Sequence, residues 1–200
     1  MKRFIYLISP KKINKNFYYS LTRVLNTKKI KFFQLRLKKI PKTRIIKIAK
    51  KIKKITKKFN VKLIINDSPQ IAKKINADGC HLGQLDPSII NARKFLKKKI
   101  IGVTCHGSVN LVNRAIKESP NYIAVGSFFK SRLKPNAKKA NKKIIKQIKK
   151  KTKISVVAIG GINDKNYKKL ISLGANYIAL SSFIWNNPSL KPEIAIRRFK

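Results

Sequence analysis

Acidic residues are scarce in this chain, and their scarcity is its most unusual compositional feature. Six acidic side chains stand against 50 basic ones among 200 residues, which gives a formal net charge of +44. Such a balance is typical of proteins that bind nucleic acid. Here, however, the basic residues are mostly lysines spread over nearly the whole chain. This distribution resembles compositional drift in an A/T-rich genome and does not identify a partner.

Cysteine and long apolar runs are also scarce. Cys80 and Cys105 lack the paired spacing of a zinc site or a redox motif, so we expect two buried free thiols and no disulfide. No stretch approaches the roughly 18 apolar residues that a membrane span requires. The apolar segment Phe4 to Ser9 is shorter than the core of a signal peptide. We therefore expect a cytoplasmic protein without a membrane partner.

Short apolar runs alternate with segments of helical spacing along the chain. The apolar runs predict buried strands at Phe4 to Ser9, Phe32 to Leu37, Val61 to Asn66, Gly79 to Leu82, Ile100 to Cys105, Tyr122 to Ser127, Val156 to Gly160 and Tyr177 to Ser182. The helical spacing predicts helices at Arg44 to Asn60, Pro69 to Ile75, Pro87 to Leu96, Val109 to Ile116, Lys142 to Lys151 and Lys165 to Leu173. Asn163 and Asp164 are the expected start of the last helix, and Gly174 is its expected stop signal.

This alternation predicts an α/β protein with a parallel sheet. Eight strand–helix units close most naturally into a (β/α)₈ TIM barrel, which we expect to form a single domain over residues 1–200. An open doubly wound sheet is the alternative, but its first β-to-α turn would carry a glycine-rich fingerprint. The turn here reads Ser9-Pro10-Lys11-Lys12 and contains no glycine. In a barrel, functional residues lie at the carboxyl ends of the strands.

Three of the six acidic residues, Asp67, Asp78 and Asp86, fall within about a tenth of the chain. Asp67 and Asp86 follow neighbouring predicted strands, so their carboxylates are expected to reach a single Mg²⁺ at one rim of the barrel. Asp78 is expected at the opposite rim. The alternative for Asp86, before Pro87, and for Asp67, before Ser68-Pro69, is a helix N-cap.

Polar residues also follow the second and fifth predicted strands. Alternation places Gln34, Arg36 and Lys38 on one side of the second, where they suit a phosphate ligand; a solvated strand end is the alternative. The fifth ends in Thr104, Cys105 and His106. Neighbouring residues on a strand point to opposite faces, so Cys105 and His106 are not expected to form a nucleophile–base pair.

The last two predicted strands end in small residues. Gly160-Gly161 follows one and Ser181-Ser182 follows the other, in the two loops that commonly bind phosphate in barrel enzymes. Glycine lets an oxyanion approach backbone N–H groups, and serine adds donors. A tight turn is the alternative for the glycines. The loop after the sixth strand, Phe128 to Pro135, mixes aromatic and basic residues. It suits either a lid over an anionic substrate or stacking on nucleic acid.

Taken in order, these segments closely resemble thiamine phosphate synthase over nearly the whole chain. The resembling segments are Gln34 to Lys38, Asn66-Asp67, His81 to Asp86, Gly102 to His106, Gly126 to Lys134, Ala158 to Ile162 and Ser181-Ser182. The family is a (β/α)₈ barrel that joins a pyrimidine methyl diphosphate to a thiazole phosphate, releasing pyrophosphate and forming thiamine phosphate. The resemblance therefore implies a transferase of thiamine biosynthesis with two phosphorylated small-molecule substrates.

The resemblance also implies roles for individual residues. It implies that the pyrimidine diphosphate is bound by Gln34, Arg36, Lys38, Asn66, Thr104 and Lys134, of which Arg36, Lys38 and Lys134 act in catalysis. It implies that Mg²⁺ is held by Asp67 and Asp86. It also implies that the thiazole phosphate is bound by Ser131, Gly160, Gly161, Ser181 and Ser182. The family's usual Thr-x-Thr-Lys sequence is replaced here by Ser131-Arg132-Leu133-Lys134, so one hydroxyl is lost at Leu133. That departure weakens the assignment of the thiazole phosphate site.

Three other functions are weighed against the synthase. A related barrel, the thiazole tautomerase, shares the fold but does not need a metal-bound diphosphate, and a paralogue acting on a related phosphorylated substrate is also left open by Leu133. A basic nucleic-acid-binding protein would gather its cations on one surface, whereas these are spread over every predicted helix. We therefore expect no specific nucleic-acid partner. A homo-oligomer is left open by the sequence.

Overall fold

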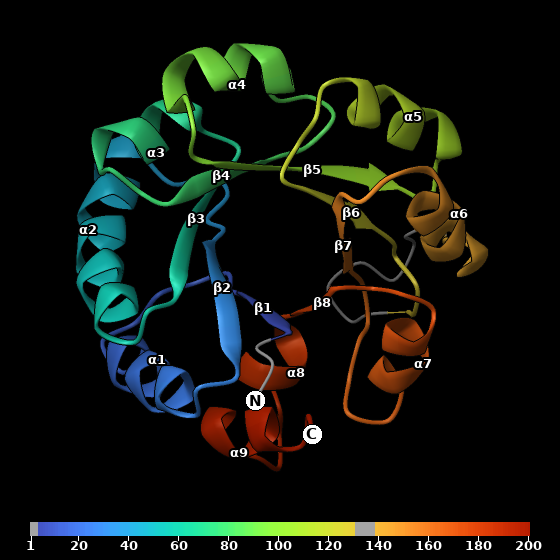
Figure 1. Ribbon diagram of the computed structural model, residues 1–200. Coiled ribbons are helices and arrows are strands. Elements are labelled where there is room, and N and C mark those ends of the chain that lie inside the picture. Colours follow the sequence, from blue (N-terminus) through green and yellow to red (C-terminus); the bar gives the residue numbers. More distant parts are fainter. Residues whose placement is uncertain (1–3, 131–138) are drawn as a thin grey trace.

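In a computed structural model, the described residues form a closed barrel of eight parallel strands surrounded by helices (Figure 1). The structure describes residues 4–130 and 139–200. The strands are β1 (Ile5–Ile8), β2 (Ile30–Leu35), β3 (Lys62–Asn66), β4 (Gly79–Leu82), β5 (Ile100–His106), β6 (Tyr122–Val125), β7 (Ser155–Ala158) and β8 (Tyr177–Leu180). The helices are α1 (Phe17–Asn26), α2 (Lys42–Lys58), α3 (Pro69–Lys74), α4 (Ile89–Leu96), α5 (Val109–Lys117), α6 (Lys143–Lys151), α7 (Tyr167–Ser172), α8 (Ser182–Trp185) and α9 (Pro192–Arg197).

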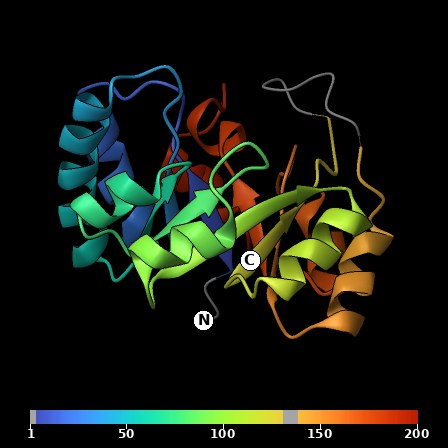
Figure 2. The same ribbon diagram turned by 90° about the horizontal axis from the view of Figure 1, so that it is seen from above.

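Each strand pairs in parallel with the next, and β8 closes the ring by pairing with β1. In that last pair Ile5 lies opposite Ile178, and Leu7 lies opposite Leu180. The turned view in Figure 2 shows the helices standing around the outside of the strands. The predicted (β/α)₈ TIM barrel is confirmed. Among the described helices none is long and apolar enough to cross a membrane.

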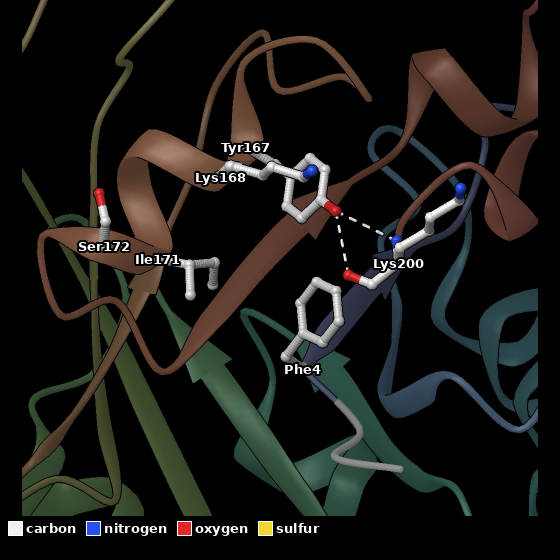
Figure 3. A pocket seen from close by; sticks show the side chains of 6 residues that line it. All are labelled: Phe4, Tyr167, Lys168, Ile171, Ser172 and Lys200. Carbon is white, nitrogen blue, oxygen red and sulfur yellow. Dashed lines mark hydrogen bonds between the residues drawn. The ribbon is translucent and has the colours of Figure 1, made fainter.

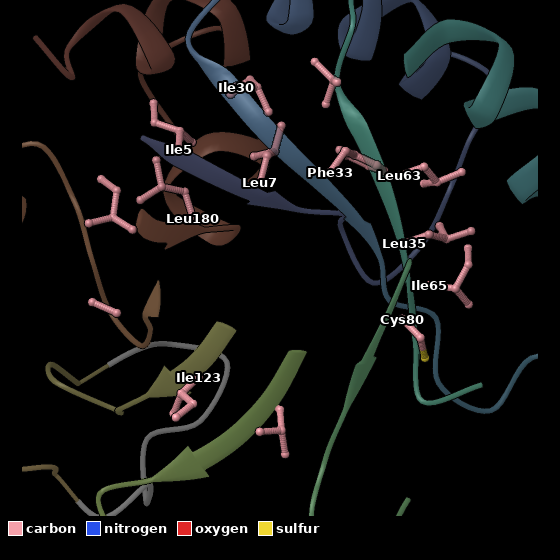
Figure 4. Packing of buried hydrophobic residues seen from close by; sticks show 14 of the residues in the cluster. Ile5, Leu7, Ile30, Phe33, Leu35, Leu63, Ile65, Cys80, Ile123 and Leu180 are labelled. Atoms are coloured by element: carbon pink, nitrogen blue, oxygen red, sulfur yellow. The ribbon is translucent and has the colours of Figure 1, made fainter. Parts of the chain in front are cut away.

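Alternate strand residues point outward and pack against the helices. Figure 4 shows several of them, among them Ile5 and Leu7 of β1, Phe33 of β2 and Leu63 of β3, all of which are fully buried. The amphipathic helices complete this layer, because each turns its apolar face toward the strands and its lysines toward solvent. Burying each large aliphatic side chain contributes roughly 1.5–3 kcal/mol. This outer layer is the larger of the two hydrophobic clusters.

The remaining strand residues point inward and fill the barrel. The inner cluster consists of Tyr6, Phe32, Ile64, Tyr122, Ala124, Val157 and Ala179. The ring of Tyr122 occupies the space that Gly102 of β5 leaves empty, since a Cβ at that glycine would lie 1.9 Å from the Tyr122 ring. The interior is therefore packed, and the strand ends above it are left to form a site.

The predictions of helices were incomplete. They missed α1, although its buried residues Phe17, Leu21, Val24 and Leu25 have helical spacing, and they missed the short helices α8 and α9. The expected start of α7 at Asn163 and Asp164 was also wrong, because Asn166 is its N-cap. Asn163 instead accepts hydrogen bonds from the N–H groups of Lys165 and Asn166, which builds a turn before the helix. Gly174 does end α7, at a φ of 103°.

Candidate active site

Polar side chains meet at the carboxyl ends of β2 and β3. Gln34 is only 2% exposed, and its Nε2 donates to Asn66 Oδ1 at 3.0 Å. Because Gln34 points into the barrel beside Asn66, the two amides form one polar surface at the rim. The structure thus brings together two residues to which the family resemblance assigns the pyrimidine diphosphate.

Asp67 follows β3 in a conformation that turns its carboxylate toward β2. Its φ of 65° lies in the left-handed region, which Asp adopts more readily than most residues. Its N–H donates to the carbonyl of His81 at 2.8 Å, and its carboxylate forms an ion pair with Lys38. Sparsely populated backbone conformations of this kind often occur at functional sites.

Asp86 lies beside this ion pair. Its Oδ2 accepts the N–H of Gly83 at 2.6 Å within the β4–α4 loop. Burial raises the pKa of Asp86, and a hydrogen bond to Asp67 together with the Asp67 charge raises it further, while the Gly83 N–H and Lys38 lower it. Two carboxylates therefore share one small region with one lysine.

Neither carboxylate serves as a helix cap, which was the alternative reading of both. Ser68 caps α3 by accepting the N–H of Ile71, and Ser88 caps α4 by accepting the N–H of Asn91. Helix capping therefore does not explain the positions of Asp67 and Asp86. Asp78 lies at the opposite rim as expected, where it accepts the N–H of Leu63 and pairs with Lys62.

The two carboxylates suit a small, hard divalent cation. Mg²⁺ is usually held by one or two carboxylates, with water and substrate phosphate completing its shell. Over residues 4–130 and 139–200 there is no group of three or more His, Cys, Asp or Glu side chains able to hold a metal ion. Burial and the nearby Asp67 charge raise the pKa of Asp86, and a cation held between the two carboxylates would neutralise that negative charge. The residues present fit Mg²⁺ bound jointly with a diphosphate.

Arg36 adds a second positive charge to this rim. Its backbone N–H donates to Ser9 Oγ at 3.0 Å, which ties the end of β2 to the end of β1. Its guanidinium forms no ion pair with any described residue, and its charge contributes to lowering the pKa of His81. The guanidinium is therefore available to an anionic ligand.

A half-buried histidine at the end of β4 is a feature that the sequence did not single out. His81 Nε2 lies 2.7 Å from Thr104 Oγ1, and Nδ1 lies 2.9 Å from the hydroxyl of Tyr122. The Tyr122 hydroxyl in turn lies 2.7 Å from that of Tyr6. Burial lowers the pKa of His81 to about 4, so the ring is uncharged at neutral pH. The alternation of inward-facing residues on β1, β4, β5 and β6 is the signal that could have grouped these four.

Cys105 and His106 are separated as expected. Cys105 is fully buried among the apolar residues outside the barrel, whereas His106 is exposed. Burial raises the pKa of the Cys105 thiol to about 12, so it carries no thiolate at neutral pH. Both cysteines are free and buried, as predicted.

The loops after β7 and β8 offer backbone and hydroxyl groups to a ligand. Gly160 and Gly161 have φ values of 94° and 65°, and a Cβ on either would lie less than 2.5 Å from a neighbouring atom, so both positions require glycine. Their amides donate to no residue of the described part of the chain. Ser181 and Ser182 begin α8 directly after β8, and β8 is paired with β7. Both features fit an oxyanion.

The loop after β6 is described only in part. Ser131 and Lys134, together with Leu133, lie outside the described residues. Before them, Phe128 is 3% exposed, and Phe129 packs beneath Lys142, whose Nζ lies 4.9 Å from the ring centre. Phe128 is thus packing rather than presenting its ring to a nucleic-acid base.

A separate pocket lies away from these residues. Its volume is about 270 Å³. Figure 3 shows the six residues that line it, which are Phe4, Tyr167, Lys168, Ile171, Ser172 and Lys200. The hydroxyl of Tyr167 donates to the carbonyl of Lys200 and accepts from its N–H. Phe4 precedes the first residue of β1, so this pocket lies at the amino-terminal ends of the strands, where barrel enzymes do not place their chemistry.

Known proteins are similar to this chain over its whole length. Residues 5–184 match the family model described as thiamine monophosphate synthase. This chain belongs to the thiamine monophosphate synthase family. It is 54% identical over 200 residues to the thiamine-phosphate synthase of Pelagibacter ubique, covering 100% of this chain and 97% of the relative. It is 36% identical over 195 residues to that of Clostridium acetobutylicum, covering 96% and 92%.

A solved structure agrees with the family assignment. Thiamine phosphate pyrophosphorylase from Pyrococcus furiosus superposes with a TM-score of 0.87 at 24% identity, covering 99% of this chain and 94% of that one. At that identity the likeness shows the fold. Together with family membership, it makes this chain a transferase of thiamine biosynthesis with thiamine-phosphate synthase function.

Proposed function

We propose that this enzyme joins a pyrimidine methyl diphosphate to a thiazole phosphate, releasing pyrophosphate and forming thiamine phosphate. The observation that carries the proposal is the cluster of Asp67, Asp86 and Lys38 at one rim of the barrel, with the guanidinium of Arg36, which pairs with no described carboxylate, on the same rim. A diphosphate is the ligand that uses all four groups at once. We also propose that residues 1–200 act as one domain.

The proposed reaction breaks the bond between the pyrimidine methylene carbon and a diphosphate oxygen. The electron pair leaves with the diphosphate, and the thiazole nitrogen then forms the new bond to the electron-poor carbon. Such a reaction needs neither a nucleophilic side chain nor a strong base. It needs positive charge placed where the leaving group gains negative charge, which is commonly the largest contribution to catalysis.

Arg36 and Lys38 are proposed to donate to the diphosphate oxygens, and Lys134, outside the described residues, is proposed to join them. Asp67 and Asp86 would hold Mg²⁺, which when bound would neutralise part of the diphosphate charge. Gln34, Asn66 and Thr104 would orient the pyrimidine ring. Holding both substrates in one site adds an orientation contribution to the rate.

The thiazole phosphate is proposed to bind the loops after β7 and β8. The amides of Gly160 and Gly161, which donate to no described residue, and the hydroxyl of Ser182 would supply donors. The hydroxyl of Ser181, which here donates to the carbonyl of Ser9, would turn to the phosphate. Ser131 is proposed to contribute another. This placement puts the two phosphorylated groups on different strand ends of the same rim, so that both reacting centres can meet above the inner cluster.

The direct test mixes both phosphorylated substrates with Mg²⁺ and measures pyrophosphate and thiamine phosphate. Chelation of the metal is expected to abolish turnover. If thiazole phosphate tautomers interconvert while the pyrimidine diphosphate is left unconsumed, the tautomerase alternative is correct instead.

Substitution of the two carboxylates tests the metal assignment. Asp67→Asn and Asp86→Asn are each expected to lower kcat about a hundredfold or more and to raise the Mg²⁺ concentration needed for half-maximal rate. Asp78→Asn is the matched control, because it removes a carboxylate at the opposite rim. Unimpaired turnover in either site variant would remove that residue from the proposed metal site.

A further inference from the structure

A continuous chain of hydrogen bonds leads from the barrel interior to the site. It joins the hydroxyl of Tyr6 to that of Tyr122, then to Nδ1 of His81, and then from Nε2 of His81 to the hydroxyl of Thr104, over contacts of 2.7, 2.9 and 2.7 Å. Tyr6 and Tyr122 are 2% and 1% exposed, whereas Thr104 is half-buried at the end of β5. The hydrogen-bond chain therefore ends inside the barrel at Tyr6 and at the candidate site at Thr104.

The buried end of this hydrogen-bond chain, at Tyr6, determines which group donates and which accepts in every bond along it. In the described part of the protein, the Tyr6 hydroxyl has the Tyr122 hydroxyl as its single hydrogen-bond partner. A buried O–H without an acceptor costs the desolvation of that group, whereas an unused lone pair on a hydroxyl oxygen costs much less. Tyr6 must therefore donate to Tyr122.

The remaining protons follow from this first one. Since the Tyr122 oxygen accepts from Tyr6, its own proton is given to Nδ1 of His81. Nδ1 must then be unprotonated, and the proton of the neutral ring is on Nε2, where it is donated to Thr104 Oγ1. A protonated imidazole would need Nδ1 to donate as well, which would turn the Tyr122 proton back toward Tyr6 and leave the Tyr6 proton without an acceptor.

We propose that Tyr122 is a positioning residue: by donating to Nδ1 it holds His81 as the Nε2–H tautomer, so that the Thr104 hydroxyl proton is left free to donate to a ring nitrogen of the pyrimidine substrate. The identity of that acceptor rests on the proposed function. An aromatic ring nitrogen is an acceptor with a lone pair in the plane of the ring, and a donor fixed in advance recognises it without reorganisation. Tyr122 acts through His81 and touches no substrate itself.

Nitrogen NMR reads the tautomer directly. The chain contains two histidines, so ¹⁵N-histidine labelling gives two rings, and His106→Asn assigns the signals of the exposed one. For His81 we expect a protonated Nε2 and an unprotonated Nδ1 at neutral pH. A His81 ring protonated at Nδ1, or at both nitrogens, would overturn the proposal whether or not the enzyme makes thiamine phosphate.

Kinetics test whether Tyr122 acts through Thr104. We expect Thr104→Val to lower kcat/KM roughly tenfold and Tyr122→Phe to lower it roughly three- to tenfold, by loss of one oriented hydrogen bond in each case. Thr104→Ser, which keeps the hydroxyl, is expected to restore most of the activity. In the Thr104→Val background, Tyr122→Phe is expected to have almost no further effect, because the hydroxyl that it orients is already absent.

A purely structural role would give a different pattern. Loss of packing at Tyr122 would lower activity by the same factor in both backgrounds, and that additive result would overturn the proposal. Tyr167→Phe is the matched control, since it removes a buried tyrosine hydroxyl at the opposite rim and is expected to leave kcat/KM unchanged. If the wild-type enzyme formed no thiamine phosphate, the proposed function would fail while the NMR result would still decide the tautomer.

Discussion

Acidification measures how strongly the barrel interior keeps His81 uncharged. The pKa of this histidine is lowered from its ordinary value of 6.5 to about 4, with burial as the largest cause. Between these two pH values His81 is protonated in the unfolded chain but unprotonated in the folded protein. The free energy of unfolding is therefore highest above pH 6.5 and decreases as the pH falls toward 4.

The magnitude follows from the size of the shift. Each pKa unit corresponds to about 1.4 kcal/mol, so a shift from 6.5 to about 4 predicts that His81 lowers the free energy of unfolding by about 2 kcal/mol at pH 5 and about 3 kcal/mol at pH 4. His81 is half-buried at the end of β4, so solvent screening reduces these figures, which are upper values.

Urea denaturation at a series of pH values is the assay. The free energy of unfolding of the wild type is expected to fall more steeply between pH 7 and 4 than that of His81→Asn, which has no titrating group at this position. His106→Asn is the matched control, because it removes the exposed histidine and should keep the full wild-type pH dependence. Parallel curves for the wild type and His81→Asn would refute the reasoning.

Three further predictions concern other parts of the molecule. Cys105→Ser is expected to leave kcat close to that of the wild type, because burial raises the pKa of the thiol to about 12; a thousandfold loss in a steady-state assay would show that the cysteine takes part in the chemistry. Gly102→Ala is expected to lower the free energy of unfolding in urea by about 1–3 kcal/mol or more, since the new Cβ would lie 1.9 Å from the Tyr122 ring; an unchanged midpoint would mean that the ring moves freely. The Tm is expected to rise with added NaCl, because 50 basic side chains face six acidic ones and salt screens their mutual repulsion; a Tm independent of salt in calorimetry would show that the charges are already neutralised.

Local pattern was sufficient for the order of strands and for most helices. Runs such as Val61 to Asn66 are apolar because both faces of a barrel strand are buried, and this signal depends on nearby residues alone. The same applies to the glycines after β7, whose positive φ values are a property of the local backbone. Boundaries were less certain, since β2 ends at Leu35 rather than at Leu37.

The site itself depended on contacts between distant segments. The sequence could place Asp67 and Asp86 after neighbouring strands, but a cap and a metal ligand look alike until Ser68 and Ser88 are seen to do the capping. Alternation along the strands could place Tyr6 and Tyr122 inside the barrel, but it could not show that their hydroxyls, 116 residues apart in the chain, lie 2.7 Å from each other.

By itself, then, the sequence determined the strand–helix alternation, the barrel and the set of polar residues at its strand ends, because each is encoded in short-range hydrophobic periodicity. Tertiary structure alone decided which of those polar groups share a neighbour, which inward-facing rings fill the barrel and which way their protons point. These properties arise when eight strands close into a ring and bring side chains from different strands to hydrogen-bonding distance. A local sequence pattern carries no information about the distance between side chains of different strands.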